Sequence, residues 1–243
     1  IAGLIESGDM KYEEIAGCRA CYLPELYEAE TNAAENFARM CRRTFRDKAN
    51  IAKLLTKLEA QQGISYAPMQ RQTLELALKN QLLVITGGPG TGKTTSIRAI
   101  LAMFDEIGIK TLLCAPTGRA AKRMTELTGR DAATVHRMLG AKFDEDNDRV
   151  VFTKDESDRL DCDAVILDEC SMVDICLMDA LLRALPPDAR LIMVGDADQL
   201  PSVGPGNVFS ALIRSQVVAT VRLTEIFRQT GDSRIIRNAH MIN

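Results

Sequence analysis

Tryptophan is absent from this sequence, and the aromatic residues together make up only 5% of it. Proteins that hold single-stranded nucleic acid by base stacking need exposed aromatic rings, so we expect no rich stacking platform here. An excess of positive charge is missing too, because the formal net charge is −3. Whole-chain electrostatics therefore do not indicate a nucleic-acid binder, and any such site has to be local.

Long apolar runs are also lacking. No stretch approaches the length needed to cross a bilayer and the N-terminus does not look like a signal peptide, so we expect no membrane partner. The seven cysteines are an odd number scattered along the chain, which is typical of a reducing cytoplasm. Cys18 and Cys21 form a lone CxxC, and zinc would need two further ligands, whereas the only histidines, His136 and His240, lie far along the chain. We interpret both cysteines as ordinary helix residues.

The first 62 residues or so carry a helical pattern. Apolar side chains recur every three or four residues in "LPELYEAETNAAENFARMC" (23–41) and again at Ile51, Leu54, Leu55 and Leu58. The stretch "QQGISYAP" then breaks the pattern. We expect a small all-helical domain, a helical bundle, over residues 1–65.

From Pro68 onward, short apolar runs alternate with helical patterns. The runs are "LLVIT" (82–86), "TLLCA" (111–115), "AVIL" (164–167) and "LIMV" (191–194). Continuous apolar runs suit strands of a parallel sheet that is covered on both faces. The alternation predicts a doubly wound α/β fold with helices on both faces of the sheet. The acidic stretch 143–161 interrupts it, and we expect an exposed loop or hairpin there.

A glycine-rich motif follows the first of these runs. "GGPGTGKT" fits the pattern G-x-x-x-x-G-K-[ST] between a predicted strand and a predicted helix. Glycines let the backbone wrap closely, so that N–H groups and the helix N-terminus face phosphate oxygens. Lys93 is expected to reach the β- and γ-phosphates of ATP, and the Thr94 hydroxyl to bind Mg²⁺. The predicted phosphate-binding residues are Gly87, Gly88, Pro89, Gly90, Thr91, Gly92, Lys93, Thr94 and Thr95.

An acidic pair ends another apolar run, "AVILDE". Asp168 would emerge at the carboxyl end of a buried strand, where open α/β sheets place their ligands. Its carboxylate is predicted to hold Mg²⁺ together with Thr94, and Glu169 to act as the general base on the attacking water. No N-K-x-D guanine signature occurs, so the motifs favour ATP hydrolysis over GTP switching.

Several further motifs occur in one order at consistent separations. They include "YAPMQRQTLELAL", "LLCAPTGRAAKRMTE", "TVHRML", "ILDECSMVD", "VGDADQLPSVGPGNVF", "LTEIFRQ" and "SRIIRNAHMIN". Together they resemble the RecD-like DNA helicases, the 5′-to-3′ branch of helicase superfamily one, over most of residues 66–243. The leading "YLPELYEAE" is similar to the segment before the motor in stand-alone members. The resemblance implies a RecA-like P-loop NTPase fold for the sheet domain.

The resemblance also implies roles at the nucleotide. Gln70 corresponds to a glutamine whose amide can read the adenine edge through a paired donor and acceptor. Gln199 is similar to the glutamine that hydrogen-bonds the γ-phosphate or the attacking water. Arg228, in "EIFRQ", resembles the arginine that reaches the γ-phosphate from the second motor domain and neutralises its charge.

Single-stranded DNA is the partner that the family resemblance implies, with duplex ends or forks as the substrate to be unwound. Two motifs would touch its backbone, and the loop after Gln199 would carry the nucleotide state toward the DNA. Nuclease or recombination subunits are further possible partners. The implied DNA-contacting residues are Thr117, Arg119, Thr134, His136, Pro201 and Ser202.

The same resemblance divides the chain. Residues 66–222 correspond to the first motor domain, and residues 223–243 to the start of a second one. The later motifs of the family are missing, so we expect a fragment that binds nucleotide and at most turns it over slowly. Losing the charges of the second domain can cost about 10³–10⁵ in rate.

Two alternatives stay open. One is the motor half of a conjugative relaxase, although relaxases need a histidine cluster and a nicking tyrosine, and this chain has two separated histidines. The other is a nucleotide-binding subunit that holds a recombination complex together without unwinding. Intact Lys93, Asp168 and Glu169 argue against a degenerate subunit.

Overall fold

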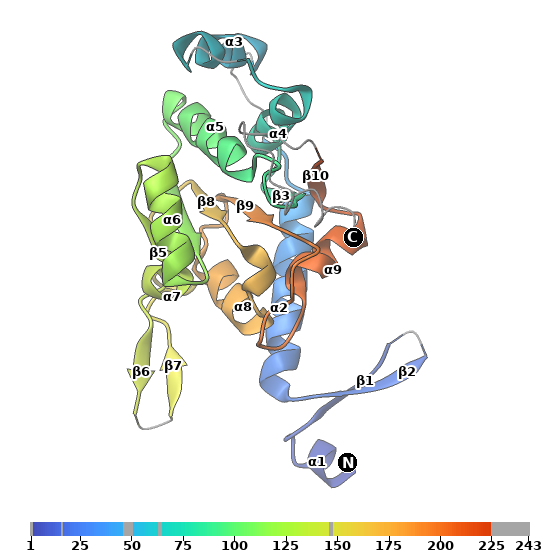
Figure 1. Ribbon diagram of the computed structural model, residues 1–243. Helices are drawn as coiled ribbons and strands as arrows, with labels where there is room; N and C mark the ends of the chain where they lie inside the picture. Colours follow the sequence, from blue (N-terminus) through green and yellow to red (C-terminus); the bar gives the residue numbers. More distant parts are fainter. Residues whose placement is uncertain (1, 16, 46–50, 63–64, 146–147, 225–243) are drawn as a thin grey trace.

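The central feature of the computed structural model is a six-stranded parallel sheet (Figure 1). The structure describes the chain except for residues 1, 16, 46–50, 63–64, 146–147 and 225–243. The sheet has the strand order β10-β3-β9-β8-β4-β5. Its strands are β3 (Leu82–Gly87), β4 (Thr111–Ala115), β5 (Ala132–Thr134), β8 (Ala164–Leu167), β9 (Arg190–Gly195) and β10 (Ala219–Leu223).

Both faces of this sheet are covered by helices, because successive side chains of each strand enter different cores. In β3, Leu82 and Val84 belong to one core, whereas Leu83 and Ile85 belong to the other. The first core is completed by α2 (Pro24–Cys41), α7 (Val135–Met138), α8 (Ile175–Ala184) and α9 (Val208–Ser215). The second contains α3 (Ile51–Gln62), α4 (Pro68–Lys79), α5 (Lys93–Glu106) and α6 (Gly118–Thr128). The predicted α/β fold is confirmed.

The four apolar runs form the four central strands, as predicted. Strands β5 and β10 were not predicted. Each lies at an edge of the sheet, and both sequences, "AAT" and "ATVRL", are only partly buried. An edge strand lacks the continuous apolar run that a central strand needs, so the signal was missing from the sequence.

The N-terminal region corrects the expectation of an all-helical domain over residues 1–65. A short helix, α1 (Ala2–Glu6), is followed by an antiparallel hairpin of β1 (Lys11–Ile15) and β2 (Cys18–Tyr22). Cys18 and Cys21 are therefore strand residues. Gly17 has φ +79° in the connection between the strands, a conformation that glycine adopts without strain and that allows the reversal. A short exposed hairpin has no apolar periodicity for sequence reasoning to detect.

Helices α2 and α3 do not form a bundle of their own. Helix α2 packs along α8, and its buried residues Ala29, Ala33, Phe37 and Met40 share a core with one face of the sheet. Helix α3 contributes Leu54, Leu55 and Leu58 to the core on the other face. The amphipathic patterns were read correctly, but each helix buries its stripe against the sheet domain.

The acidic stretch 143–161, which interrupts the alternation of strands and helices, contains a second hairpin, as expected. It consists of β6 (Lys142–Asp144) and β7 (Arg149–Val151), and it projects from the body of the molecule (Figure 1). Across the described part of the chain, no helix is both long enough and apolar enough to cross a membrane.

Candidate active site

The glycine-rich motif forms the turn from β3 into α5. Gly90 has φ +78°, and Gly92, the N-cap of α5, has φ +89°. Both values lie in the left-handed region, where a side chain would be strained. The hydroxyl of the buried Thr91 donates to the carbonyl oxygen of Gly88 at 2.9 Å and closes the turn. The free N–H groups of a helix start are thereby gathered around one concave loop.

Gly87 could not be replaced by a residue with a side chain. A Cβ atom there would lie 2.6 Å from the Thr91 hydroxyl and 2.7 Å from the carbonyl oxygen of Leu223 in the neighbouring strand β10. The loop leaves the sheet in close contact with the edge strand, so its first residue must be glycine.

Lys93 lies folded along the loop. Its ammonium donates to the carbonyl oxygens of Gly87 at 2.5 Å and Gly88 at 3.0 Å. A cation is thus held at the mouth of the loop, where the first turn of α5 also attracts negative charge. Thr94 is half-buried beside it, and Pro89, Gly90 and Thr95 are exposed. Apart from the buried Thr91, the predicted phosphate-binding residues are at least partly exposed.

The acidic pair lies where β8 ends. The Asp168 N–H donates to the carbonyl oxygen of Cys114 in β4 at 3.0 Å, and the Asp168 carboxylate accepts from the Glu169 N–H at 2.9 Å. Burial raises the pKa of Asp168, and the nearby charges of Lys93 and Arg123 oppose that shift.

Glu169 has a strained backbone. Its φ of +54° is left-handed, which is uncommon for a residue with a side chain, and it precedes the short 3₁₀ helix η1 (Cys170–Met172). Such strain persists only where surrounding contacts fix it, and it gathers at functional sites. Here the Glu169 N–H is held by the Asp168 carboxylate, so the two acids are fixed relative to each other.

The oxygen donors fit a magnesium ion. Mg²⁺ is usually held by one or two carboxylates together with substrate phosphates and water. The Asp168 carboxylate and the Thr94 hydroxyl offer hard oxygen ligands beside the phosphate loop. In the part of the chain that the structure describes, no group of three or more His, Cys, Asp or Glu side chains could hold a metal by itself. This donor set suits an ion that arrives with a phosphate ligand.

The loop after β9 lies between the phosphate loop and the acidic pair. The side-chain oxygen of Gln199 accepts from the hydroxyl of Ser171 in η1 at 3.4 Å. On the other side, the Thr86 hydroxyl at the end of β3 accepts from the Ala197 N–H at 3.2 Å. Because β9 lies between β3 and β8, Gln199 stands between the phosphate loop and the acidic pair.

Asp196 is a further candidate residue of this site, and the sequence analysis did not identify it. It directly follows β9, only 4% of it is exposed, and its carboxylate accepts from the Asp198 N–H at 3.1 Å. It shares the carboxyl edge of the sheet with Asp168. The available signal was an acid immediately after a buried strand, the same signal that identified Asp168.

Gln70 lies near the start of α4 and is only 8% exposed. Its side-chain oxygen accepts from the Ala67 N–H at 3.0 Å and so caps its own helix. The residue is thus no ordinary surface glutamine, and its predicted contact with adenine stays a prediction. Arg228 falls outside the described residues.

The implied DNA-contacting residues Thr117 and Thr134 lie on neighbouring strand ends. Thr117 caps α6, where its hydroxyl accepts from the Ala120 N–H at 3.2 Å. Thr134 caps α7 in the same way, with the Arg137 N–H at 3.1 Å. Thr134 pairs with Ala115 in the parallel β4–β5 ladder, so both caps lie at the carboxyl edge of the sheet.

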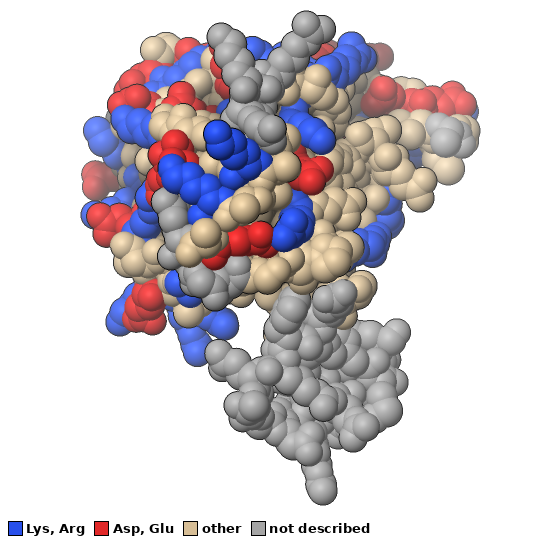
Figure 2. Space-filling view, turned by 90° about the horizontal axis from the view of Figure 1, so that it is seen from above, with Lys and Arg blue, Asp and Glu red and all other residues tan. Residues whose placement is uncertain are grey.

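The remaining implied DNA contacts are accessible. Arg119 and His136 are exposed, and the His136 ring lies 5.9 Å from the ring of Phe152. Pro201 is exposed, and the Ser202 hydroxyl donates to the carbonyl oxygens of Gly204 at 3.0 Å and Gly206 at 2.9 Å. The loop after Gln199 is therefore internally tied. Figure 2 shows Lys and Arg side chains gathered in the middle of the upper face, with Asp and Glu interspersed.

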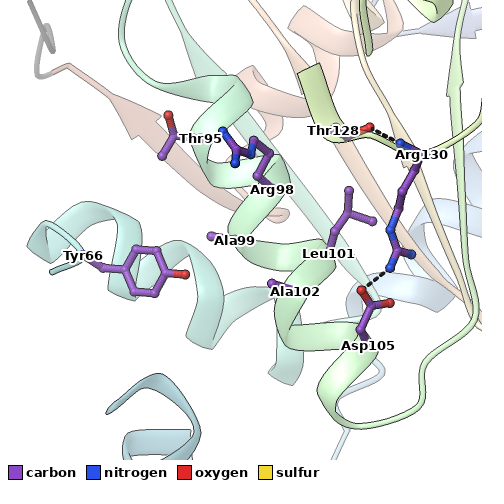
Figure 3. Close-up of a pocket in the computed structure, with 9 residues that line it drawn as sticks. All are labelled: Tyr66, Thr95, Arg98, Ala99, Leu101, Ala102, Asp105, Thr128 and Arg130. Carbon is purple, nitrogen blue, oxygen red and sulfur yellow. Dashed lines mark hydrogen bonds and ion pairs between the residues drawn. The ribbon is translucent and has the colours of Figure 1, made fainter. Parts of the chain in front are cut away.

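A pocket of about 550 Å³ lies along α5 (Figure 3). Its floor is the outer face of α5, which begins at Lys93. The Tyr66 side chain points toward α5 on one side, and the Arg130–Asp105 ion pair closes the other. The residues lining it are Tyr66, Thr95, Arg98, Ala99, Leu101, Ala102, Asp105, Thr128 and Arg130.

Comparisons with known proteins agree with this geometry. A family model described as an AAA domain matches residues 70–205. The ATP-dependent RecD2 DNA helicase of Deinococcus radiodurans is 38% identical over 219 residues, which are 90% of this chain and 29% of that protein. The RecBCD enzyme subunit RecD of Mycobacterium tuberculosis is 40% identical over 167 residues, 59% of this chain and 28% of that subunit.

Solved structures show the same fold. The crystal structure of Bacteroides Pif1 bound to ssDNA superimposes with a TM-score of 0.50 at 26% identity, covering 71% of this chain and 45% of that one. The chain spans less than a third of the length of the two curated relatives above. From its glycine-rich loop, acidic pair and sheet order, and from these matches, the chain belongs to the AAA-domain family and, within it, to the RecD-like DNA helicases.

Proposed function

We propose that the protein binds MgATP at the carboxyl edge of its sheet and hydrolyses it to drive movement along single-stranded DNA. One observation carries the proposal. The phosphate loop, the loop with Gln199 and the acidic pair follow three adjacent strands, β3, β9 and β8, and the middle loop donates to the Thr86 hydroxyl on one side and accepts from the Ser171 hydroxyl on the other. Open α/β sheets bind their ligands at this edge.

The side chains divide the chemistry of hydrolysis among them. Lys93 neutralises charge on the β- and γ-phosphates, while Thr94 and Asp168 would hold Mg²⁺, which supplies further charge neutralisation. Glu169 accepts a proton from water as the water oxygen attacks the γ-phosphorus. The bond from that phosphorus to the bridging oxygen breaks, and ADP and inorganic phosphate leave. Gln199 orients the water or the γ-phosphate.

The DNA part of the proposal rests on family membership and on exposed residues. One relative is named a DNA helicase, and a structurally similar protein was crystallised with single-stranded DNA. Thr117 and Thr134 cap helices at the edge that also holds the nucleotide residues. A strand bound there would sense the nucleotide through the loop after Gln199. Movement in the 5′-to-3′ direction and unwinding of duplex ends or forks follow the family.

The names of the relatives are compatible with a protein that acts alone or as a subunit of a larger complex. One is named as a helicase in its own right and another as a subunit of the RecBCD enzyme. We propose a motor in either setting, in recombination or repair. A nucleotide-binding subunit without motor activity, or the motor half of a relaxase, would be the alternative.

The test is ATP hydrolysis by the full-length protein with and without single-stranded DNA. We expect stimulation by DNA, and loss of hydrolysis by at least about 100-fold in Lys93→Ala. Hydrolysis that DNA does not stimulate would favour the non-motor subunit. Cleavage of a supercoiled DNA substrate would instead favour the relaxase.

A further inference from the structure

A carboxylate on α3 ties together the segment that leads into Gln70. The Glu59 side chain accepts from the Tyr66 N–H at 2.7 Å, and its two oxygens accept from one guanidinium nitrogen of Arg71, Nη2, at 2.7 and 2.8 Å. The Arg71 guanidinium also donates to the carbonyl oxygen of Tyr66 at 3.3 Å. Three elements, namely α3, the segment before α4, and α4 itself, therefore meet at one side chain.

Glu59 is the buried partner of this contact, whereas the Arg71 side chain is 46% exposed. Only 15% of the Glu59 side chain is exposed, and both of its oxygens are used. A hydrogen bond between a charged guanidinium and a carboxylate is stronger than one between neutral groups. Tyr66, which it holds, is 3% exposed in the core beneath α5. We call Glu59, Arg71 and the Tyr66 backbone the clamp.

The clamp determines the position of one particular N–H group. Ala67 follows Tyr66, and its N–H donates to the side-chain oxygen of Gln70 at 3.0 Å. This bond fixes which way the Gln70 amide faces, because a flipped amide would turn its NH₂ group toward the Ala67 N–H. The amide orientation of Gln70 is thus set by the backbone that the clamp holds.

Amide orientation decides whether adenine fits. Adenine presents an acceptor, N7, beside a donor, the N6 amino group, whereas guanine presents two acceptors, N7 and O6. A glutamine that offers its NH₂ group to N7 and its oxygen to the N6 amino group accepts adenine. Guanine mismatches the amide in either orientation, because the glutamine oxygen faces O6 or, after a flip, N7. A flipped amide would also mismatch adenine, so the bond from the Ala67 N–H preserves the contact with ATP.

We propose that Glu59 and Arg71 are positioning residues that lock the Gln70 amide in its adenine-selective orientation, so that this clamp sets the preference for ATP over GTP. The inference rests on the proposed function, because it takes Gln70 to read the base of the nucleotide at the phosphate loop. The location agrees, since Tyr66 and Thr95, two residues beyond Lys93, line the same pocket. Glu59 lies outside the residues that the family model matches.

The experiment compares kcat/KM for ATP and for GTP in the full-length protein with single-stranded DNA present. In Glu59→Ala we expect the ATP-to-GTP ratio to fall about tenfold, the effect of losing one oriented hydrogen bond. The loss should come from a higher KM for ATP at nearly unchanged kcat. Glu59→Gln keeps an acceptor for the Tyr66 N–H, so it should retain most of the ratio.

The matched control is Lys57→Ala. Lys57 also joins α3 to the sheet domain, through an ion pair with Glu106 at the end of α5, but it does not touch residues 66–71. We expect it to leave the ratio unchanged. An equal fall in Lys57→Ala and Glu59→Ala would mean that general packing of α3 is responsible, and would overturn the clamp.

Two further variants separate the possible failures. If Gln70→Ala leaves the ratio unchanged, Gln70 does not read the base, so that part of the proposed function and the clamp's role in selectivity both fall. If Gln70→Ala lowers the ratio but Glu59→Ala does not, the base contact stands and the clamp is wrong. Should Glu59→Ala fail to fold, Arg71→Lys answers the same question, because lysine keeps the charge but lacks the second nitrogen with which Arg71 holds the Tyr66 carbonyl oxygen beside Glu59. An unchanged ratio in Arg71→Lys would then overturn the proposal.

Discussion

The two ends of the central sheet are built in opposite ways. At the amino ends of β3 and β9, buried polar side chains contact backbone carbonyl oxygens and an aromatic ring. Gln81 donates to the carbonyl oxygens of Pro187 at 2.7 Å and Ala189 at 2.9 Å. The guanidinium of Arg190, a residue that is 8% exposed, lies 3.9 Å from the centre of the Phe45 ring. This end joins the segment after α2 to the sheet and has no concave loop.

At the carboxyl ends of the same strands the chain is strained and open. Glycines with positive φ make the phosphate loop, Glu169 is left-handed, and Gln199 is exposed. Burial disfavours the charge on Asp168 and raises its pKa, and the positive charge of Lys93 partly opposes this. The residues that stabilise the fold and those that carry the chemistry are therefore separated by the length of one strand. We expect substitutions at the amino end to lower stability and substitutions at the carboxyl end to lower hydrolysis.

The largest expected effect is at the carboxyl end. Glu169→Gln keeps the shape of the side chain but removes the base, and we expect kcat for ATP hydrolysis to fall about 10³-fold. Nucleotide affinity and thermal midpoint should stay close to wild type. Steady-state kinetics and thermal unfolding check this together. A variant that loses mainly stability would break the proposed separation.

At the amino end of the sheet, a substitution should lower stability and leave nucleotide binding unchanged. Arg190→Ala removes a buried cation, its contact with Phe45 and its hydrogen bond to the Leu78 carbonyl oxygen at 3.3 Å. We expect a loss of about 2–4 kcal/mol in the free energy of unfolding, measured with denaturant. The affinity of the folded protein for nucleotide should not change. If affinity fell with stability, the two ends would be coupled.

How much of this the sequence could reveal depends on the range of the interactions. The phosphate loop and Asp168 could be located because local composition marks them: glycines between a strand and a helix, and an acid after an apolar run. The hydrogen bond between Ser171 and Gln199 and the contact of Glu59 with Arg71 could not be predicted, since each joins separate elements. The exposed hairpin over residues 11–22 was missed because it lacks a buried face.

The smallest expected effect concerns α8, away from both ends. Burial raises the pKa of Asp179 to about 6, and its ion pair with Arg183 only partly opposes this. The folded protein therefore binds this proton more tightly than the unfolded chain, and stability falls as the pH rises from about 4 to 6.

Asp179→Asn removes that ionisation. We expect the variant to gain about 1–2 kcal/mol relative to wild type at pH 8, and the gain to shrink as the pH falls through 6 toward 4. Denaturant unfolding at several pH values measures the difference. A gain that grows on acidification would contradict the assignment. Nucleotide binding should not respond, because Asp179 belongs to neither end of the sheet.

The central claim is that the glycine-rich loop at the carboxyl end is a nucleotide site centred on Lys93. Calorimetric titration of MgATP into the protein tests it most directly, with Lys93→Ala and Arg190→Ala as the two variants. The account predicts saturable binding by wild type and by folded Arg190→Ala, and affinity at least about tenfold weaker in Lys93→Ala. Equal affinity in Lys93→Ala and wild type would contradict it.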